Sequence, residues 1–160
     1  MQVSITSDIS TAWRLPFSTR ELETALREMW LAFGPEDTAP FPDNALLEFA
    51  LVDEAEMARL NRENLGCAGP TNILAFPADD SPLFPGAAPG AGLLAMSPWT
   101  VRREAMLYGQ EPAAYTMRLL AHGLAHLLGH EHGPAMDEAA GRAALAALAA
   151  VCRAEGASHV

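Results

Sequence analysis

Hydrophobic and polar positions alternate along the first part of the chain and then change to a helical period. Val3, Ile5 and Ile9 alternate with Ser and Thr, which predicts a half-buried strand over Val3–Ile9. Ser18-Thr19-Arg20-Glu21 has the pattern of a capping box, and apolar residues at helical spacing follow it. The sequence therefore predicts a strand followed by a helix that ends at Gly34-Pro35.

The middle of the chain repeats the order of strand and helix. An apolar stretch predicts a strand over 45–52, and Asp53 with Glu56 predicts the start of a helix that turns Met57 and Leu60 toward the core. Two further strands are predicted over Thr71–Pro77 and Gly92–Ser97. Residues 79–92 are rich in proline and glycine, and they are interpreted as a surface loop that either borders a site or is a tolerated insertion.

Three helices are predicted in the last third of the chain. Pro98, Pro112 and Pro134 each suit the first turn of a helix, where a missing N–H costs nothing. Residues 113–128 are apolar on most sides, which predicts a buried central helix. The last helix is expected to extend to about Val151, with Leu145 and Leu148 packed inward.

This order predicts a single α+β domain over residues 1–160, with a small mixed sheet and helices packed around the central helix. The hydrophobic content of 50% is that of a globular protein, and no segment suits a membrane span. The first residues lack the basic and apolar regions of a secretion signal, so a cytoplasmic setting is expected. Cys67 and Cys152 are expected to be free thiols.

The charge of the chain argues against a generally basic nucleic-acid-binding surface. The net charge is −10, and all ten basic residues are Arg. Phosphate binding depends on clustered cations, so any basic patch must be local and built from residues such as Arg102, Arg103 and Arg118.

Four of the five histidines lie within eleven residues, between His122 and His132. His122 and His126 are four positions apart, so on a helix their rings share one face and can bind one ion. Gly129 suits a left-handed turn that would return His132 as a third ligand. Three nitrogen ligands leave an open position, which is typical of a catalytic zinc rather than a structural one.

The same spacing occurs in metzincin proteases, where the residue after the first histidine is a glutamate that acts as general base. Here that residue is Gly123, which has no side chain to accept a proton. Peptide hydrolysis by that mechanism is therefore not expected.

Two segments resemble the YbeY family of bacterial metal-dependent endoribonucleases. Residues 122–132 are similar to the family motif H-G-x-x-H-L-x-G-Y-D-H, and Leu60-Asn61 with residues 70–77 is similar to L-N followed by P-T-(D/N)-V-L-S-F-P. The resemblance covers the whole chain and is most specific between Leu60 and His132. It implies a single-strand-specific ribonuclease in rRNA maturation and ribosome quality control, with one zinc per chain on His122, His126 and His132.

The chain departs from the family pattern at several polar positions. The loop arginine that faces the metal cleft in the family and is thought to bind phosphate aligns with Leu65, and Arg62 lies three residues earlier. Further departures are Ala75 for serine, Leu93 for the usual acid, His130 for tyrosine and Glu131 for aspartate. The metal ligands are intact, while the polar residues around them are fewer.

The remaining site residues are candidates only, because the sequence identifies no general base. Arg118 lies four residues before His122 and is expected to point toward the site, and Glu131 either orients an imidazole or is a solvated acid. His130 is interpreted as a fourth ligand, a proton shuttle or an exposed residue. Asn72 either hydrogen-bonds the substrate or satisfies a turn.

Three functions remain open at this stage. The first is a zinc-dependent endoribonuclease whose partners are single-stranded rRNA and the ribosome or its proteins, with no role for DNA or a membrane. The second is a ribosome-associated assembly or binding factor with structural zinc and weak or no nuclease activity. The third is a zinc hydrolase of a peptide or small ester, against which Gly123 argues.

Overall fold

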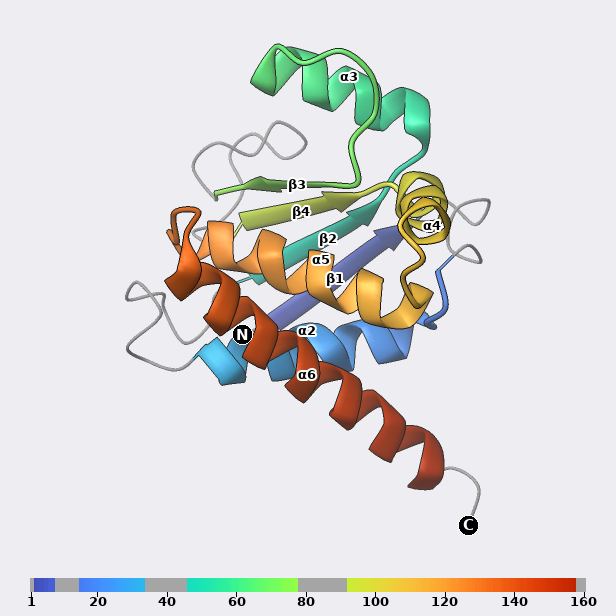
Figure 1. The fold of residues 1–160 in the computed structure, drawn as a ribbon, viewed down its shortest axis with the longest axis vertical. Helices are drawn as coiled ribbons and strands as arrows, with labels where there is room; N and C mark the ends of the chain where they lie inside the picture. The colour runs from blue at the N-terminus through green and yellow to red at the C-terminus, as the bar shows by residue number, and fades with distance from the viewer. Residues whose placement is uncertain (1, 8–14, 34–45, 78–91, 158–160) are drawn as a thin grey trace.

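A mixed β-sheet with helices on both faces forms the centre of the molecule (Figure 1). The computed structural model describes residues 2–7, 15–33, 46–77 and 92–157. Its elements, in chain order, are β1 (Gln2–Ser7), α2 (Thr19–Phe33), β2 (Leu46–Leu51), α3 (Glu54–Leu65), β3 (Ile73–Phe76), β4 (Gly92–Met96), α4 (Pro98–Leu107), α5 (Pro112–Leu127) and α6 (Pro134–Ala157).

The sheet has the strand order β1-β2-β4-β3. β1 and β2 are parallel, as are β2 and β4, whereas β3 pairs antiparallel with β4 at the edge. The register pairs Val3 with Leu47 and Leu74 with Ala95. The prediction of an α+β fold with a small mixed sheet is confirmed.

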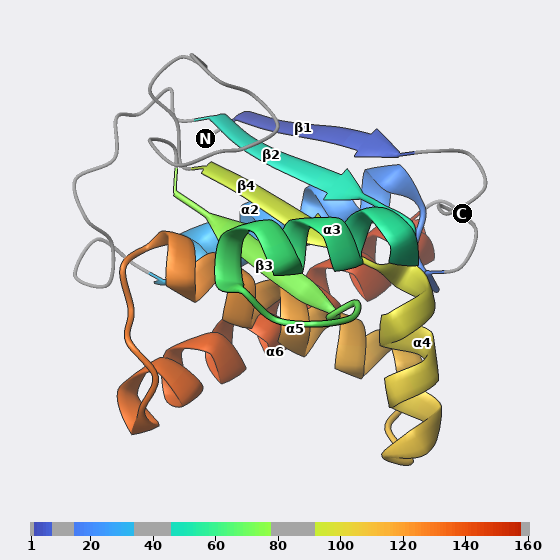
Figure 2. The same ribbon diagram turned by 90° about the horizontal axis from the view of Figure 1, so that it is seen from above.

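Alternate residues of β4 face two different hydrophobic cores. Leu94 and Met96 belong to the larger core, which α2, α5 and α6 complete. Leu93 and Ala95 belong to a smaller core beneath α3. Because successive side chains of a strand point to opposite faces, one fully buried strand supports both layers. Figure 2 shows α3 across the sheet from α5 and α6.

The predicted helix starts are confirmed by their hydrogen bonds. The Ser18 N–H donates to Glu21 Oε2 at 2.6 Å, and the Glu21 N–H donates to Ser18 Oγ at 3.3 Å, which forms the capping box of α2. Asp53 Oδ1 accepts the Glu56 N–H at 2.8 Å at the start of α3. These bonds satisfy N–H groups that the first helical turn leaves without carbonyl partners.

The central helix α5 is buried along most of its length, as predicted, and it packs against β3, β4, α2, α4 and α6. Figure 1 shows it running across one face of the sheet, with α6 next to it. This position holds the residues of α5 between the sheet and the last helix.

The prediction for the last helix was wrong in two respects. α6 continues to Ala157, beyond Val151, and Leu145 is 70% exposed. Leu148 does pack against the core. The buried face of α6 consists mainly of alanines such as Ala143 and Ala147, whose small side chains let the helix lie close to its neighbours.

Other predictions concern the ends of elements, the cysteines and membrane spans. β1 ends at Ser7, and residues 8–14 and the predicted loop from 79 to 91 lie outside the described residues. Cys67 and Cys152 are exposed free thiols, as expected. In the part of the chain that the structure describes, every helix is too short or too polar to cross a bilayer.

Candidate metal centre

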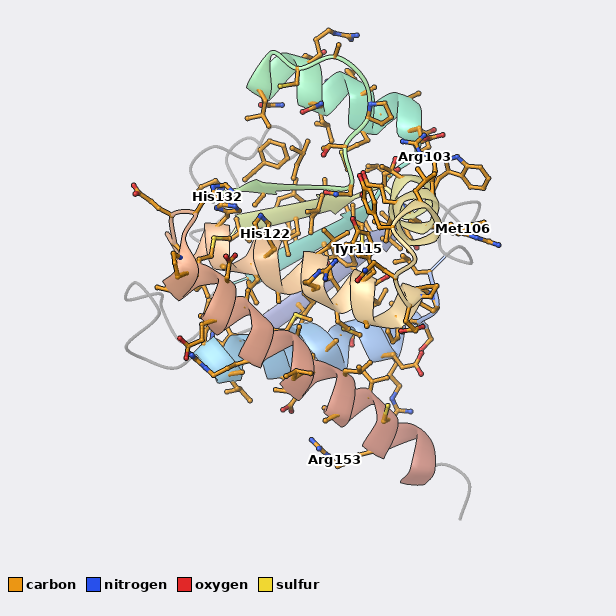
Figure 3. The ribbon with its side chains drawn as sticks, in the orientation of Figure 1. Arg103, Met106, Tyr115, His122, His132 and Arg153 are labelled. Atoms are coloured by element: carbon orange, nitrogen blue, oxygen red, sulfur yellow. The ribbon has the colours of Figure 1, made fainter. Side chains whose placement is uncertain are left out.

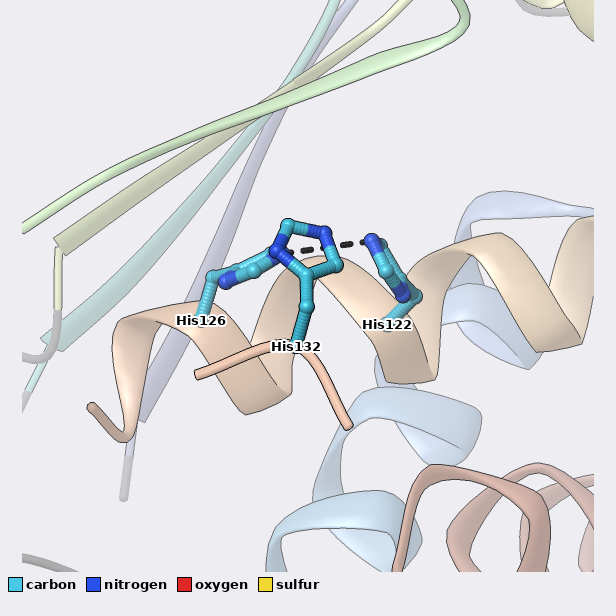
Figure 4. A group of neighbouring side chains, drawn as sticks. All are labelled: His122, His126 and His132. Carbon is cyan, nitrogen blue, oxygen red and sulfur yellow. Dashed lines mark hydrogen bonds between the residues drawn. The ribbon is translucent and has the colours of Figure 1, made fainter. Parts of the chain in front are cut away.

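His122 and His126 lie one turn apart on the same face of α5, where both side chains are half-buried. Their Nε2 atoms are 3.2 Å apart (Figure 4). Helical periodicity brings the two rings together, as the spacing predicted. Two imidazole nitrogens therefore converge without any contribution from the rest of the fold.

A glycine turn after α5 brings the third histidine back to the first two. Gly129 has a φ of 86°, in the left-handed region, and its N–H donates to the His126 carbonyl at 3.0 Å. The His130 N–H donates to the Ala125 carbonyl, also at 3.0 Å. These bonds close the helix end and reverse the chain, so the prediction that Gly129 returns His132 is confirmed.

The three rings form a compact group whose size suits a metal ion. Ring centroids are 4.7 Å apart for His122 and His126, 4.5 Å for His126 and His132, and 5.4 Å for His122 and His132. One nitrogen from each ring lies within 4.8 Å of the other two. A tetrahedral zinc with Zn–N bonds of 2.0–2.1 Å requires nitrogens about 3.3 Å apart, so the group fits after small ring rotations.

The surroundings of the site favour the neutral imidazoles that metal binding requires. Burial lowers the pKa of His122, and the neighbouring His126 and His132 lower it further. Burial is also the largest cause of the lowered pKa of His126, followed by His132. A neutral ring offers a lone pair to a metal without first losing a proton.

A carboxylate that the sequence analysis overlooked also acts on the site. Asp137 lies in the first turn of α6, and its charge raises the pKa of His122, opposing part of the effect of burial. Glu131, the acid proposed from the sequence, is exposed. Asp137 follows His132 by only five positions, so its nearness could have been found from the short connection between the two helices.

The packing around Gly123 is tight, in addition to the absence of a general base at this position. A Cβ at this position would lie 2.8 Å from Ile73 Cδ1 and 3.0 Å from Leu94 Cδ2. α5 therefore approaches β3 and β4 closely at the residue next to the first ligand. The sequence analysis interpreted this glycine only through chemistry, because the strands that crowd it are distant in sequence.

Asn72 belongs to a hydrogen-bond network that joins β3, α4 and α5. Its Nδ2 donates to Glu104 Oε2 at 2.8 Å, and its Oδ1 accepts the Ile73 N–H at 2.6 Å. The Tyr115 hydroxyl donates to the same Glu104 oxygen at 2.9 Å. The sequence does not predict the roles of Glu104 and Tyr115, since neither belongs to a recognisable motif.

Arg118 is exposed in the first half of α5, one turn before His122, and its contacts are with residues other than the histidines. Its Nη1 donates to Gln110 Oε1 at 3.3 Å, and its guanidinium carbon is 5.1 Å from the centroid of the Tyr115 ring. Arg103, which was expected to contribute to a basic patch, forms an ion pair of 3.2 Å with Glu54. His130 is half-buried, with its ring centroid 5.8 Å from that of Phe33.

The departures from the family pattern lie in different surroundings. Leu93 is fully buried in the core beneath α3, on the face of the sheet away from α5. Ala75 is packed against the larger core, on the side of the metal helix. Leu65, the last residue of α3, is 62% exposed. Leu93 therefore fills the smaller core, and its side chain lies on the face of the sheet away from the histidines.

Fold and site together define a single-domain α+β protein with a helix-borne three-histidine site that can hold a metal ion. The sequence model described as Endoribonuclease YbeY matches residues 10–146. The chain belongs to the YbeY endoribonuclease family, whose members are metal-dependent ribonucleases.

Individual relatives agree with this assignment. The chain is 39% identical over 153 residues to Endoribonuclease YbeY of Oleidesulfovibrio alaskensis, covering 85% of this chain and 86% of that protein. It is 41% identical over 152 residues to the protein of the same name from Nitratidesulfovibrio vulgaris, covering 84% and 90%. A solution structure of a Thermotoga maritima protein has the same fold, with a TM-score of 0.59, 17% identity and coverage of 92% and 90%.

Proposed function

We propose that this protein is a zinc-dependent endoribonuclease that cleaves single-stranded RNA in rRNA maturation and ribosome quality control. The convergence of His122, His126 and His132 carries the proposal, because it supplies three nitrogen ligands and leaves one side of the ion open. Membership of an endoribonuclease family supplies the substrate class. The expected partners are rRNA and the ribosome or its proteins, which places the activity in the cytoplasm.

In this proposal the three histidines hold one zinc ion per chain. Zinc would supply Lewis acidity toward a phosphodiester. The packing of α5 against β3 and β4 fixes the helix that carries two of the ligands, and the Gly129 turn fixes the third. In the folded protein these contacts therefore hold the three histidines close to one another.

Other side chains are proposed to position the RNA. Arg118 is the candidate for a phosphate contact, since its exposed guanidinium is held only by a neutral amide and an aromatic ring among the contacts described. Asn72 would contact the substrate by exchanging its bond to Glu104 for one to RNA. Glu131, exposed and next to His132, is the candidate for orienting that imidazole.

Metal content and turnover test the proposal together. Purified protein should contain one zinc per chain by mass spectrometry, and His126→Ala should lose it. Single-stranded rRNA fragments should be cleaved by the wild type and not by His122→Ala prepared in parallel. An RNase activity that persists in His122→Ala would be a contaminant, and cleavage without bound metal would contradict the proposal.

A second candidate function is that of a ribosome-associated assembly or binding factor with structural zinc. The exposed Leu65 at the position of the family's phosphate-binding arginine favours this function, together with the net charge of −10. Such a factor would retain zinc and bind rRNA or ribosomal proteins without turnover. Stoichiometric zinc with unchanged RNA after prolonged incubation would identify it.

Hydrolysis of a peptide or small ester is the least supported function. The helix carries Gly123 where the zinc peptidases carry their base, and even a Cβ at this position would crowd Ile73 Cδ1, at 2.8 Å. Incubation with unstructured peptides should yield no cleavage under conditions that cleave RNA.

A further inference from the structure

Two tyrosines and an arginine form a cluster at the end of α5 opposite the turn that holds the third histidine. Tyr115 precedes His122 by seven positions, so helical periodicity places both on one face of α5. Figure 3 shows the two residues along this helix. The guanidinium of Arg118 lies over the Tyr115 ring, and the Tyr108 ring meets it edge-on, with centroids 6.5 Å apart and planes at 61°. Tyr108, Tyr115 and Arg118 are called the tyrosine–arginine cluster below.

The centre of this cluster is rigid because Tyr115 is fixed by the surrounding structure. Its side chain is buried, and its hydroxyl donates to Glu104, which also accepts from Asn72. Burial and the Glu104 bond raise the pKa of Tyr115 to about 12, so the phenol is neutral at physiological pH. A neutral ring in a fixed position supports both Arg118 and Tyr108.

The outer parts of the cluster are accessible to a ligand. Tyr108 is 64% exposed, and Arg118 is exposed with no carboxylate partner among the contacts described. The two acids nearest to Tyr108 in sequence already accept other hydrogen bonds. Glu104 accepts from Asn72 and Tyr115. Glu111 accepts from the N–H groups of Ala113 and Ala114. The cluster therefore presents an aromatic face and a cation together.

We infer that the tyrosine–arginine cluster is a subsite for a nucleotide of single-stranded RNA, with a base stacked on Tyr108 and a phosphate bound by Arg118. Stacking on an aromatic ring beside an arginine is a sequence-tolerant way to hold a single strand. The inference rests on the proposed function, since it places the strand along α5 toward the histidines.

The distance from Tyr115 to His122 suits a single strand of RNA that reaches both the tyrosine–arginine cluster and the histidines. Seven helical residues between Tyr115 and His122 span about 10 Å along the axis, because the rise is roughly 1.5 Å per residue. Stacked nucleotides of one strand are about 3.4 Å apart, so roughly three nucleotides bridge the distance. The chain carries a net charge of −10, so an exposed cation on this path favours one route for the phosphates.

The test measures RNA binding without cleavage. Fluorescently labelled single-stranded oligoribonucleotides of increasing length, with phosphorothioate linkages that resist cleavage, are titrated by anisotropy against the zinc-loaded protein. Affinity should rise once the strand is long enough to span from the histidines to Tyr108. Tyr108→Ala should lower the affinity for the longer oligoribonucleotides about tenfold, since base stacking contributes roughly 1–3 kcal/mol per base.

Two matched variants separate stacking from other effects. Tyr108→Phe should keep the gain, because its ring still stacks, and Leu107→Ala should also keep it, because this neighbour is equally exposed but aliphatic. A gain that survives Tyr108→Ala, or that Leu107→Ala abolishes equally, would overturn the inference. If the wild-type protein did not cleave RNA, this result would count against the proposed function alone, since the binding assay does not depend on cleavage.

Discussion

Gly123, between His122 and His126 on α5, shows how one residue serves both packing and chemistry. The Ile73 and Leu94 side chains occupy the space that a Cβ would enter, so the helix can lie close to β3 and β4. Because glycine has no side chain, this position also lacks the general base that a zinc peptidase carries after its first histidine. The chemical consequence was predictable from the sequence, whereas the packing role depends on strands distant along the chain.

Arg118 provides a prediction at the residue scale that concerns RNA. Arg118→Ala should weaken RNA binding and lower the slope of log affinity against log salt by about 1, as expected for loss of one phosphate contact. The control is Arg153→Ala, because Arg153 is an exposed cation at the far end of α6 (Figure 3). Equal slopes for Arg118→Ala and wild type would show that Arg118 does not contact phosphate.

Tyr115 provides a prediction about alkaline pH. Its pKa is raised from 10.0 to about 12, so the folded state keeps the phenolic proton to higher pH than the unfolded chain. The resulting stabilisation is complete below pH 10 and is lost as pH rises through about 12. In a Tyr108→Phe background, Tyr115 is the only tyrosine, so phenolate absorbance should titrate near pH 12 in folded protein and near 10 in denaturant. Coincident curves would contradict this prediction.

At the scale of elements, local signals were more informative than distant ones. The starts of α2 and α3 were predictable because Ser18 with Glu21 and Asp53 with Glu56 act across three residues. The antiparallel position of β3 at the edge of the sheet could not be predicted, because it depends on pairing with β4 across the intervening segment. The exposed Leu145 was wrongly placed in the core because the small side chains that bury α6 are alanines.

The glycines of α5 and α6 allow a matched prediction for these two helices. Gly123→Ala should lower the free energy of unfolding by about 1 kcal/mol, because crowding of Ile73 and Leu94 outweighs the gain in helix propensity. Gly141→Ala should raise it by up to about 1 kcal/mol, since nothing lies within 4 Å of the added Cβ. Urea unfolding measures both.

The crowding at Gly123 can be tested separately. Ile73→Ala should be destabilising alone but should reduce the cost of Gly123→Ala in a double-mutant cycle, since the two side chains compete for one space. Additive effects of the two substitutions would show that Ile73 does not crowd this position.

At the scale of the whole molecule, bound metal should stabilise the fold. His132 lies between α5 and α6, so an ion held by the three histidines joins the two helices across their connection. A chelator should lower Tm, and added zinc should raise it in proportion to the logarithm of free zinc above its Kd. His126→Ala should have a Tm that neither treatment changes. A chelator effect of equal size in His126→Ala would place the stabilising metal elsewhere.

The three histidines and the tyrosine–arginine cluster differed in how far the sequence could predict them. The histidines were predictable because a helical turn and one glycine are enough to assemble them. Tyr115 of the cluster is held by Glu104, which also accepts from Asn72, 32 positions earlier in the chain, so only the assembled sheet and helices reveal this support. A motif search therefore finds the three histidines and overlooks the cluster that we propose as a binding subsite for RNA.

The short path from His122 to His132 also bears on the order of folding. Closing this loop costs little entropy, whereas pairing β1 with β2 must wait until the segment containing α2 has been brought into place. The metal site can therefore assemble before the sheet does. Zinc present during refolding should then increase the refolding rate in stopped-flow experiments, in addition to slowing unfolding. An effect on the unfolding rate alone would show that the site forms only after the rate-limiting step.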